Sequence, residues 1–242
     1  MKKLIALLAL LLLQPLVIQA AINGVHLDEV DIDLSDSEAL KRGADHYVKY
    51  CLGCHSAKHI RYSRIAKDLG LEKAEILAIA PDGAGIYDPM FSAMNPEDAL
   101  IWFGGAKAPD LSLIARSRGA DWLYTYLRSF HVDDSKPLGT NNLVFKDVGM
   151  PNVLYSLQGK QEKTCKDPGN NSIDSCLNIT EAGTISSSEF NQFTEELVGF
   201  LVYVGEPSKL QRLTMGKYVL LFMLLFIYVA YLLKKEYWKD ID

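Results

Sequence analysis

The sequence predicts a mainly α-helical domain with long loop insertions, followed by one C-terminal transmembrane helix. Three observations lead to this fold class. Apolar residues make up 49% of the 242 residues, and the excess is concentrated in one run near each end. Between these runs, apolar residues recur at helical spacing, whereas the alternation typical of strands is confined to short pieces. Capping residues and Gly or Pro breakers separate the helical segments. This length accommodates one medium-sized domain plus targeting segments.

Residues 1–20 have the composition of a secretory signal peptide. Lys2 and Lys3 precede an apolar run that ends in the small residues Ala20 and Ala21, an order typical of export signals. We expect cleavage at this end of the run, and an uncleaved N-terminal anchor is the alternative. Residues 21–209 would then form an exported domain, which in a bacterium lies in the periplasm.

The first helix of this domain is expected from a capping box at residues 35–38. Its apolar face carries Leu40, Ala44 and Tyr47, and continues to Cys51. Further helices are expected over residues 65–80, from 95 to about 105, from 113 to about 126, and from 187 to 204. The remaining long segments, residues 133–149 and 158–189, are rich in breakers and polar residues and are predicted as loops.

The pentapeptide CLGCH at residues 51–55 carries the chemistry of the domain. Two thiols three residues apart, followed at once by an imidazole, are the pattern that attaches a c-type haem. In a helical segment these positions share one face, so Cys51 and Cys54 can bind the haem vinyl groups while His55 binds the iron. A thioredoxin-like redox pair gives His55 no role, and a zinc site needs a second ligand pair at matching spacing. We therefore predict one covalently bound haem c.

A haem held by one histidine has a second axial position to be assigned. A methionine thioether there raises the reduction potential, whereas an open position binds gases or peroxide. Met90, Met94 and Met150 are the candidates. Met150 lies between Gly149, which allows close backbone approach, and Pro151, which stiffens the chain. The residues alone favour Met150 and leave Met90 and Met94 open.

Cys165 and Cys176 bracket a ten-residue polar loop. Disulfides persist in exported domains, and closing this loop would stabilise the fold by roughly 3 kcal/mol. We expect a disulfide here, with two free thiols as the alternative.

The second apolar run, residues 218–233, contains no charged residue. Sixteen helical residues span about 24 Å, so flanking lysines must snorkel for the helix to cross a hydrocarbon core of about 30 Å. Tyr237 and Trp238 suit the interfacial belt, and the lysines at this end indicate the cytoplasmic side. We predict an anchor over residues 210–235 in the bacterial inner membrane and a cytoplasmic tail over 236–242. A buried core helix is the alternative.

The charge of the predicted domain is acidic. Setting aside the two lysines of the signal, and the four lysines and three carboxylates after Met215, leaves 19 basic and 27 acidic residues, a net charge of −8. Such a domain is not expected to bind nucleic acid, and its field would attract basic protein partners. Surface carboxylates that serve only solubility are the alternative.

These motifs resemble the cytochrome c1 family, the haem-bearing subunits of ubiquinol–cytochrome c oxidoreductase (bc1) complexes. The run PDLSLIARSR at residues 109–118 is the specific signature, because CxxCH occurs in every c-type cytochrome. The other matching segments are Arg42-Gly43 before the haem motif, residues 95–97 followed by 105–106, the GMP loop at 149–151 and the segment from residue 206 into the anchor. The resemblance covers nearly all of the predicted mature chain.

The resemblance implies a cytochrome c-like helical domain and makes Met150 the second iron ligand. It also implies that Arg118 pairs with a haem propionate, which needs a charge-assisted partner when buried. Trp122 or Tyr124 would add a hydrogen bond at that edge. A backbone carbonyl near Ala108, where the family usually has the first of two prolines, would orient the His55 ring.

The implied function is one-electron transfer, without bond-making chemistry of its own, in a respiratory ubiquinol–cytochrome c reductase. Cytochrome b and a Rieske iron–sulfur protein would be the partners in the complex. Electrons would pass from the Rieske protein to a soluble or membrane-bound cytochrome c. The main alternative is a membrane-anchored monohaem cytochrome that donates to a haem–copper oxidase. A haem-based gas sensor and a thiol–disulfide protein are more distant alternatives.

Overall fold

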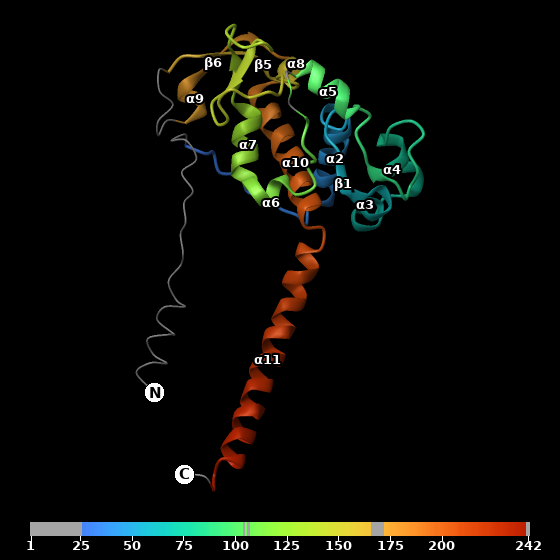
Figure 1. The fold of residues 1–242 in the computed structure, drawn as a ribbon, viewed down its shortest axis with the longest axis vertical. Helices are drawn as coiled ribbons and strands as arrows, with labels where there is room; N and C mark the ends of the chain where they lie inside the picture. Colours follow the sequence, from blue (N-terminus) through green and yellow to red (C-terminus); the bar gives the residue numbers. More distant parts are fainter. Residues whose placement is uncertain (1–25, 104, 106, 166–171, 241–242) are drawn as a thin grey trace.

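The computed structural model describes residues 26–103, 105, 107–165 and 172–240. The predicted signal peptide, residues 1–20, lies outside the described residues. The rest forms a helical domain with one long helix, α11 (Lys209–Tyr237), projecting from it (Figure 1). This architecture confirms the predicted fold class of a mainly α-helical domain followed by one helix long and apolar enough to cross a membrane.

Two helices, α2 (Ser37–Tyr50) and α10 (Ser187–Gly205), cross at the centre of the domain (Figure 1). Gly43 permits the close crossing, since a Cβ atom there would lie 2.1 Å from the backbone oxygen of Glu196. Apolar faces of both helices meet in the core. The fully buried side chains of this region include Ala44, Tyr47, Leu197, Val198 and Phe200.

The start of α2 differs from the prediction by one residue. Asp36, rather than Ser35, is the N-cap, and its Oδ1 accepts a hydrogen bond from the backbone N–H of Ala39 at 3.0 Å. The N–H and hydroxyl of Ser35 instead donate to Asp33. Ser and Asp cap helices equally well, so adjacent candidates are not separated by the pattern alone.

The helix predicted over residues 65–80 is in fact two helices, α3 (Tyr62–Leu69) and α4 (Lys73–Ile79). Gly70 ends α3 with a φ of 65°, the left-handed conformation that terminates many helices. A single glycine within the apolar pattern was the signal that the prediction overlooked.

The helix predicted from residue 113 to about 126 is divided in the same way. The segments α6 (Ile114–Arg118) and α7 (Ala120–Arg128) meet at Gly119, whose φ is 92°. The turn at Gly119 places α7 against α10, and Trp122 and Leu123 of α7 are buried. The N-terminal end of this region agrees with the prediction to within one residue, since α6 begins at Ile114 with Leu113 as its N-cap.

Six short strands form three two-stranded antiparallel sheets in the described part of the chain. The pairs are β1 (Ala57–Arg61) with β2 (Pro89–Met90), β3 (Phe130–Val132) with β4 (Thr140–Asn142), and β5 (Gly159–Lys163) with β6 (Leu177–Ala182). The helix α5 (Pro96–Trp102) follows β2, with Asn95 as its N-cap, as expected.

The segment predicted as a loop over residues 158–189 contains more structure than expected. It contains the paired strands β5 and β6 and the short helix α9 (Ile173–Cys176), and the short helix α8 (Tyr155–Gln158) directly precedes β5. Cys165 and Cys176, expected to pair, form a disulfide. All but the first residue of β6 are exposed. Leu177 and Ile179 alternate with Asn178 and Thr180, but the alternation is too short to separate this strand from the polar residues around it.

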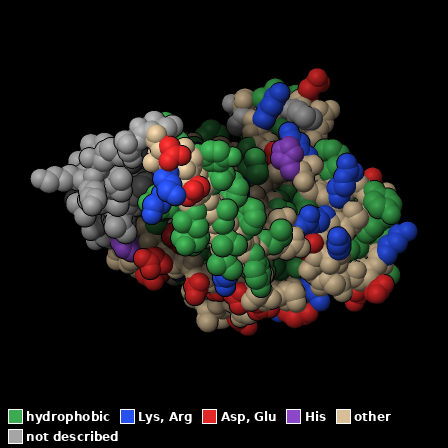
Figure 2. Space-filling view, turned by 90° about the horizontal axis from the view of Figure 1, so that it is seen from below, with side chains coloured by type: hydrophobic (Ala, Val, Ile, Leu, Met, Phe, Trp, Pro, Cys, Tyr) green, Lys and Arg blue, Asp and Glu red, His purple; other side chains and the backbone are tan. Residues whose placement is uncertain are grey.

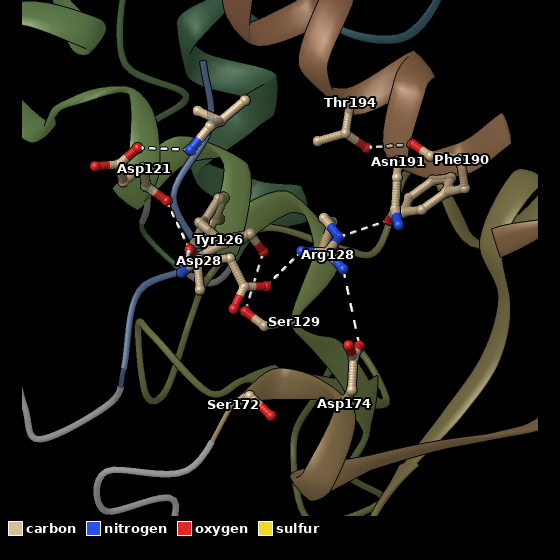
Figure 3. Close-up of polar contacts among 12 residues, drawn as sticks. Asp28, Asp121, Tyr126, Arg128, Ser129, Ser172, Asp174, Phe190, Asn191 and Thr194 are labelled. Atoms are coloured by element: carbon tan, nitrogen blue, oxygen red, sulfur yellow. Dashed lines mark hydrogen bonds and ion pairs between the residues drawn. The ribbon is translucent and has the colours of Figure 1, made fainter. Parts of the chain in front are cut away.

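Arg128, the last residue of α7, ties several segments together (Figure 3). Its side chain is buried and forms an ion pair with Asp28 from the chain that precedes α2. Its Nε donates to Oδ1 of Asn191 on α10 at 2.8 Å, and the exposed Asp174 of α9 lies 3.8 Å away. The guanidinium also lies 4.6 Å from the ring centre of Tyr124.

The long helix α11 carries apolar side chains around its whole circumference. None of its residues is buried, so the alternative of a buried core helix is wrong. In Figure 2, seen from below, hydrophobic side chains gather on this projecting helix while charged side chains surround it on the domain. A helix that is apolar on all sides suits a lipid environment. The described helix spans the predicted anchor and continues two residues beyond it.

Candidate haem site

A cavity of about 320 Å³ lies beside the turn at residues 51–55, α6, α7 and the loop that carries Met150. This volume is within the range of cofactor sites in proteins. The predicted residues Cys51, Cys54, His55, Arg118 and Met150 all line it. Most of the remaining wall is apolar and includes Leu111, Ile114, Leu123, Leu127, Val148, Leu197 and Leu201.

The CLGCH segment forms a tight turn directly after α2, which ends at Tyr50. The backbone N–H groups of Cys54 and His55 both donate to the carbonyl oxygen of Cys51, at 3.1 and 2.8 Å. The helical spacing of the three side chains is therefore kept beyond the helix end. The hydroxyl of Tyr47 donates to the carbonyl of His55 at 2.7 Å and fixes the end of the turn.

The two cysteines of this turn are free thiols. Burial raises the pKa of the Cys51 thiol to about 12, and the neighbouring Cys54 adds to the shift. A thiol–disulfide catalyst needs the opposite, a thiol whose pKa is lowered so that the thiolate is available. The environment of Cys51 thus argues against the redox-pair alternative.

The imidazole of His55 is oriented by a backbone carbonyl. Its Nδ1 lies 2.8 Å from the oxygen of Pro109, and because a carbonyl only accepts, Nδ1 carries the proton. The other ring nitrogen, Nε2, is then left as a free lone pair, the form that binds a metal. Burial lowers the pKa of this imidazole and favours the neutral ring. The carbonyl expected near Ala108 is supplied by the next residue.

The segment that contains Pro109 is held against the chain that follows the haem motif. The N–H of Leu111 donates to the oxygen of Ser56 at 2.8 Å. The carboxylate of Asp110 accepts from the N–H groups of Lys58 and Ser112, both at 3.0 Å. These bonds lower the pKa of Asp110 against the effect of its burial. They fix the Pro109 carbonyl relative to His55.

Of the three methionine candidates, Met150 lines the cavity, whereas Met90 and Met94 lie outside its lining. Met90 is buried in the core, where it lies on β2 and pairs with Ala57 of β1. The hydroxyl of Tyr126 donates to Sδ of Met150 at 3.3 Å. The cavity therefore brings together one imidazole and one thioether, the two ligand types expected for the iron.

Arg118 and Trp122 share the wall of the cavity that α6 and α7 form. The guanidinium carbon of Arg118 lies 5.0 Å from the ring centre of Trp122 and 6.0 Å from that of Phe145. The indole Nε1 of Trp122 is buried and has no hydrogen-bond acceptor among the residues that the structure describes. Tyr124 was the other residue expected to donate a hydrogen bond to a haem propionate. It lies against Arg128 and does not line the cavity.

The chemistry of this lining fits a c-type haem. A buried donor without an acceptor normally costs stability, and a haem propionate beside Arg118 would satisfy Trp122. Thiols, imidazole and thioether converge on an apolar cavity, as covalent attachment and axial ligation require. Over the described residues, no group of three or more His, Cys, Asp or Glu side chains could hold a metal ion, which argues against the zinc alternative.

Tyr126 and Phe145 line the cavity, but neither was predicted as a site residue from the sequence. Tyr126 lies four positions after Trp122 on α7, so helical spacing alone places both on one face, and this signal would have found it. Phe145 belongs to the loop before Met150 and was not recognisable in the sequence, because its approach to Arg118 depends on how that loop returns to the cavity.

Comparisons with known proteins show which family this chain resembles. Residues 30–241 match the family model described as the Cytochrome C1 family. The chain is 44% identical to the cytochrome c1 of Allochromatium vinosum over the full length of both. It is also 44% identical to a protein of Nitrosomonas europaea named ammonia monooxygenase gamma subunit, over 97% of each chain. The mitochondrial cytochrome c1 haem protein of Neurospora crassa is 26% identical over 84% of this chain and 62% of its own length.

Proposed function

The chain belongs to the cytochrome c1 family, and from this premise we propose that it passes single electrons from a Rieske iron–sulfur protein to a soluble cytochrome c. It is a haem-containing electron-transfer subunit of the bc1 complex and carries one covalently bound c-type haem. When bound, the haem supplies one-electron chemistry, since its iron is stable in both the ferric and ferrous states. Cytochrome b and the Rieske protein are the partners expected in that complex.

In this proposal, Cys51 and Cys54 would hold the haem through thioether links and His55 would bind the iron through Nε2. The supporting observation is the bond from His55 Nδ1 to the Pro109 oxygen, which leaves Nε2 available. Met150, which lines the same cavity, would supply the second ligand to the iron. A thioether ligand poises the potential higher than a second nitrogen ligand would.

Arg118 and Trp122 bind the haem propionates in this proposal. The guanidinium offers charge-assisted hydrogen bonds, and the buried Nε1 of Trp122 offers a donor that has no acceptor among the described residues. The apolar wall formed by α7 and α10 keeps water from the iron. A dry, low-dielectric surrounding also disfavours the extra positive charge of ferric iron, which again favours a high potential.

The helix α11 anchors the protein in a membrane, and we propose that the domain, residues 21–209, lies on the periplasmic side. The tail, residues 236–242, would then be cytoplasmic. The lysines and aromatic residues at the end of α11 support this orientation. Protease added to the outside of spheroplasts should degrade the haem domain, whereas domain protection would contradict the orientation.

The test of the electron-transfer proposal uses the complex isolated from membranes through an affinity tag on this chain. We expect a band of this size that retains haem on a denaturing gel, together with cytochrome b and a Rieske centre. Ubiquinol should reduce the c-type haem, and added soluble cytochrome c should reoxidise it. Co-purification with a haem–copper oxidase, without cytochrome b, would support the alternative function instead.

Replacing the proposed sulfur ligand gives a direct test of the site. Met150→Leu removes the thioether but retains the two cysteines, so haem should stay covalently attached. We expect the midpoint potential to fall by on the order of 100 mV, within the span of about 0.8 V that axial ligands set. Redox titration measures the fall, and Met94→Leu is the matched control that should leave the potential unchanged. An unchanged potential in the Met150 variant would remove it as a ligand.

A further inference from the structure

The sulfur of Met150 has a partner of its own within the cavity, the hydroxyl of Tyr126 at 3.3 Å. A thioether sulfur has two lone pairs, of which iron ligation uses one, so the other can accept this bond. We propose that Tyr126 is a positioning residue that holds the Met150 thioether and raises the reduction potential of the haem. The inference rests on the proposed role of Met150 as an iron ligand.

The ring of Tyr126 is held on two sides. It stacks on Trp122, with ring centres 4.9 Å apart and planes 9° apart. The edge of Phe130 contacts it at 5.1 Å between centres, with planes 70° apart. Both neighbours lie on or directly after α7. The hydroxyl is therefore presented from a rigid element, as a precise hydrogen bond to a weak acceptor requires.

The chain that leads to Met150 is also hydrogen-bonded to the backbone of Tyr126. The buried amide of Asn142 donates through Nδ2 to the carbonyl oxygen of Tyr126 at 2.8 Å. Its Oδ1 accepts from the N–H groups of Val144 and Phe145, at 2.9 and 3.0 Å. One side chain thus joins the backbone of the donor to the loop of the acceptor. These bonds consequently fix the position of the Tyr126 hydroxyl relative to the Met150 sulfur.

The direction of the effect follows from electron density at the sulfur. Ferric iron draws more density from its ligands than ferrous iron does. A hydroxyl that donates to the second lone pair opposes that withdrawal, and so disfavours the ferric state relative to the ferrous state. The bond also resists displacement of the sulfur by an external ligand. Removing the hydroxyl should therefore lower the potential and open the axial position more often.

Tyr126→Phe is the test, because it deletes the hydroxyl and keeps the ring that stacks on Trp122. Tyr124→Phe is the matched control, since it makes the same change two residues away on α7, outside the cavity lining. Both are made in the full haem-loaded chain. The measurements are the midpoint potential, the near-infrared charge-transfer band of the ferric protein that reports sulfur ligation, and carbon monoxide binding to the reduced protein.

We expect Tyr126→Phe to raise the ratio of oxidised to reduced haem at a fixed redox poise by up to about tenfold, equivalent to about 59 mV for one electron. The charge-transfer band should persist but shift in energy, and carbon monoxide should bind faster. Tyr124→Phe should change none of these. An unchanged potential and band in Tyr126→Phe would overturn the inference, as would an equal change in Tyr124→Phe.

Met150→Leu separates this inference from the ligand assignment on which it rests. Loss of the band in Met150→Leu, combined with no effect of Tyr126→Phe, would leave the proposed ligand intact and overturn the inference alone. Retention of both the band and the potential in Met150→Leu would overturn both proposals together.

Discussion

Pro109 contributes its carbonyl oxygen to the site, and this group is common to every residue type. The resemblance led us to expect two prolines here, whereas this chain has Ala108 before Pro109. The bond to His55 Nδ1 forms nevertheless, because Asp110 and Leu111 fix the backbone to the segment after the haem motif. The substitution at 108 removes only ring stiffness. The orientation of the His55 ring therefore depends on where the backbone carbonyl of residue 109 lies and not on the side chain at residue 108.

His46 is another histidine with a defined environment, although it lies outside the cavity lining. Its ring stacks on Phe193 at 4.1 Å between ring centres, and its Nε2 lies 3.2 Å from the buried carboxylate of Glu196. Burial lowers the pKa of His46, and the bond to Glu196 only partly opposes this shift. The folded protein therefore holds His46 neutral more strongly than the unfolded chain does.

This shift predicts a pH dependence of stability. Between the lowered folded pKa and the unfolded value near 6.5, the unfolded chain binds more protons, so stability rises with pH. The stabilisation is complete above about pH 6.5 and is lost as the pH falls below it. Thermal unfolding from pH 8 to pH 5 should show a smaller loss of stability in His46→Gln than in the unaltered protein.

The exposed His59 provides the control for this experiment. His59→Gln should keep the pH dependence of the unaltered protein. If His46→Gln loses as much stability on acidification as the unaltered protein, its burial is not responsible for the effect.

At the scale of elements, the crossing of α2 and α10 depends on one missing side chain. Gly43→Ala would place a Cβ atom 2.1 Å from the Glu196 oxygen, which is backbone and cannot rotate away. The helices would have to separate, and overpacking of this kind costs about 3 kcal/mol. Denaturant unfolding of the purified chain should show this loss, or the variant should fail to accumulate with haem.

Gly199 on α10 is the matched control, because it lies in the same core with more space. A Cβ atom there would have its nearest neighbour at 3.6 Å, an ordinary contact. Alanine also favours helix over glycine by up to about 1 kcal/mol. Gly199→Ala should therefore be neutral or stabilising, and equal losses in both variants would contradict the account given for Gly43.

The two acidic partners of Arg128, which come from different elements, are predicted to contribute unequally to stability (Figure 3). Arg128→Leu would leave Asp28 partly buried without its ion-pair partner, at a cost of about 3 kcal/mol. Asp174→Ala removes a partner that is 85% exposed and 3.8 Å away, and exposed pairs contribute at most about 1 kcal/mol. Denaturant midpoints should separate the two variants. A larger loss in Asp174→Ala would show that the surface contact is the important one.

The elements that the sequence predicted well are those whose signals are local. The helix α10 begins at the expected residue because Ser186 and Glu189 form a capping box. The errors occur at Gly70 and Gly119, which interrupt helices through positive φ values that the apolar pattern does not show. The hairpin β5–β6 was also missed, since its order comes from pairing across the chain and from the disulfide.

At the scale of the whole molecule, the junction between domain and anchor is braced by ion pairs. Glu206, just after α10, accepts from Arg212 of α11 at 2.6 Å and lies 3.3 Å from Arg116 of α6. Arg64 of α3 also donates to the carbonyl oxygen of Pro207 at 3.4 Å. The same short helix α6 ends in Arg118 at the cavity. The helix α6 therefore contacts the junction with the anchor through Arg116 and lines the cavity through Arg118.

The charge of the domain predicts how it meets a soluble partner. With a net charge of −8 over residues 21–215, it should attract a basic cytochrome c, and salt screens such attraction over a Debye length that falls from about 30 Å at 0.01 M to about 10 Å at 0.1 M. We expect the second-order rate of cytochrome c reduction by the complex to fall about tenfold over this range. An uncharged acceptor should show no such fall, and a rate that rises with salt would indicate an acidic partner.

The sequence by itself determined the covalent chemistry and the membrane anchor. Residues 51–55 and the uncharged run at 218–233 are contiguous, so their meaning does not depend on how distant parts of the chain meet. The tertiary structure decided which of three methionines shares a cavity with His55, which carbonyl orients that ring, and that Tyr126 donates to Met150. Each of these contacts joins residues between 24 and about 95 positions apart. Such contacts follow from packing of the whole domain, which local patterns do not encode.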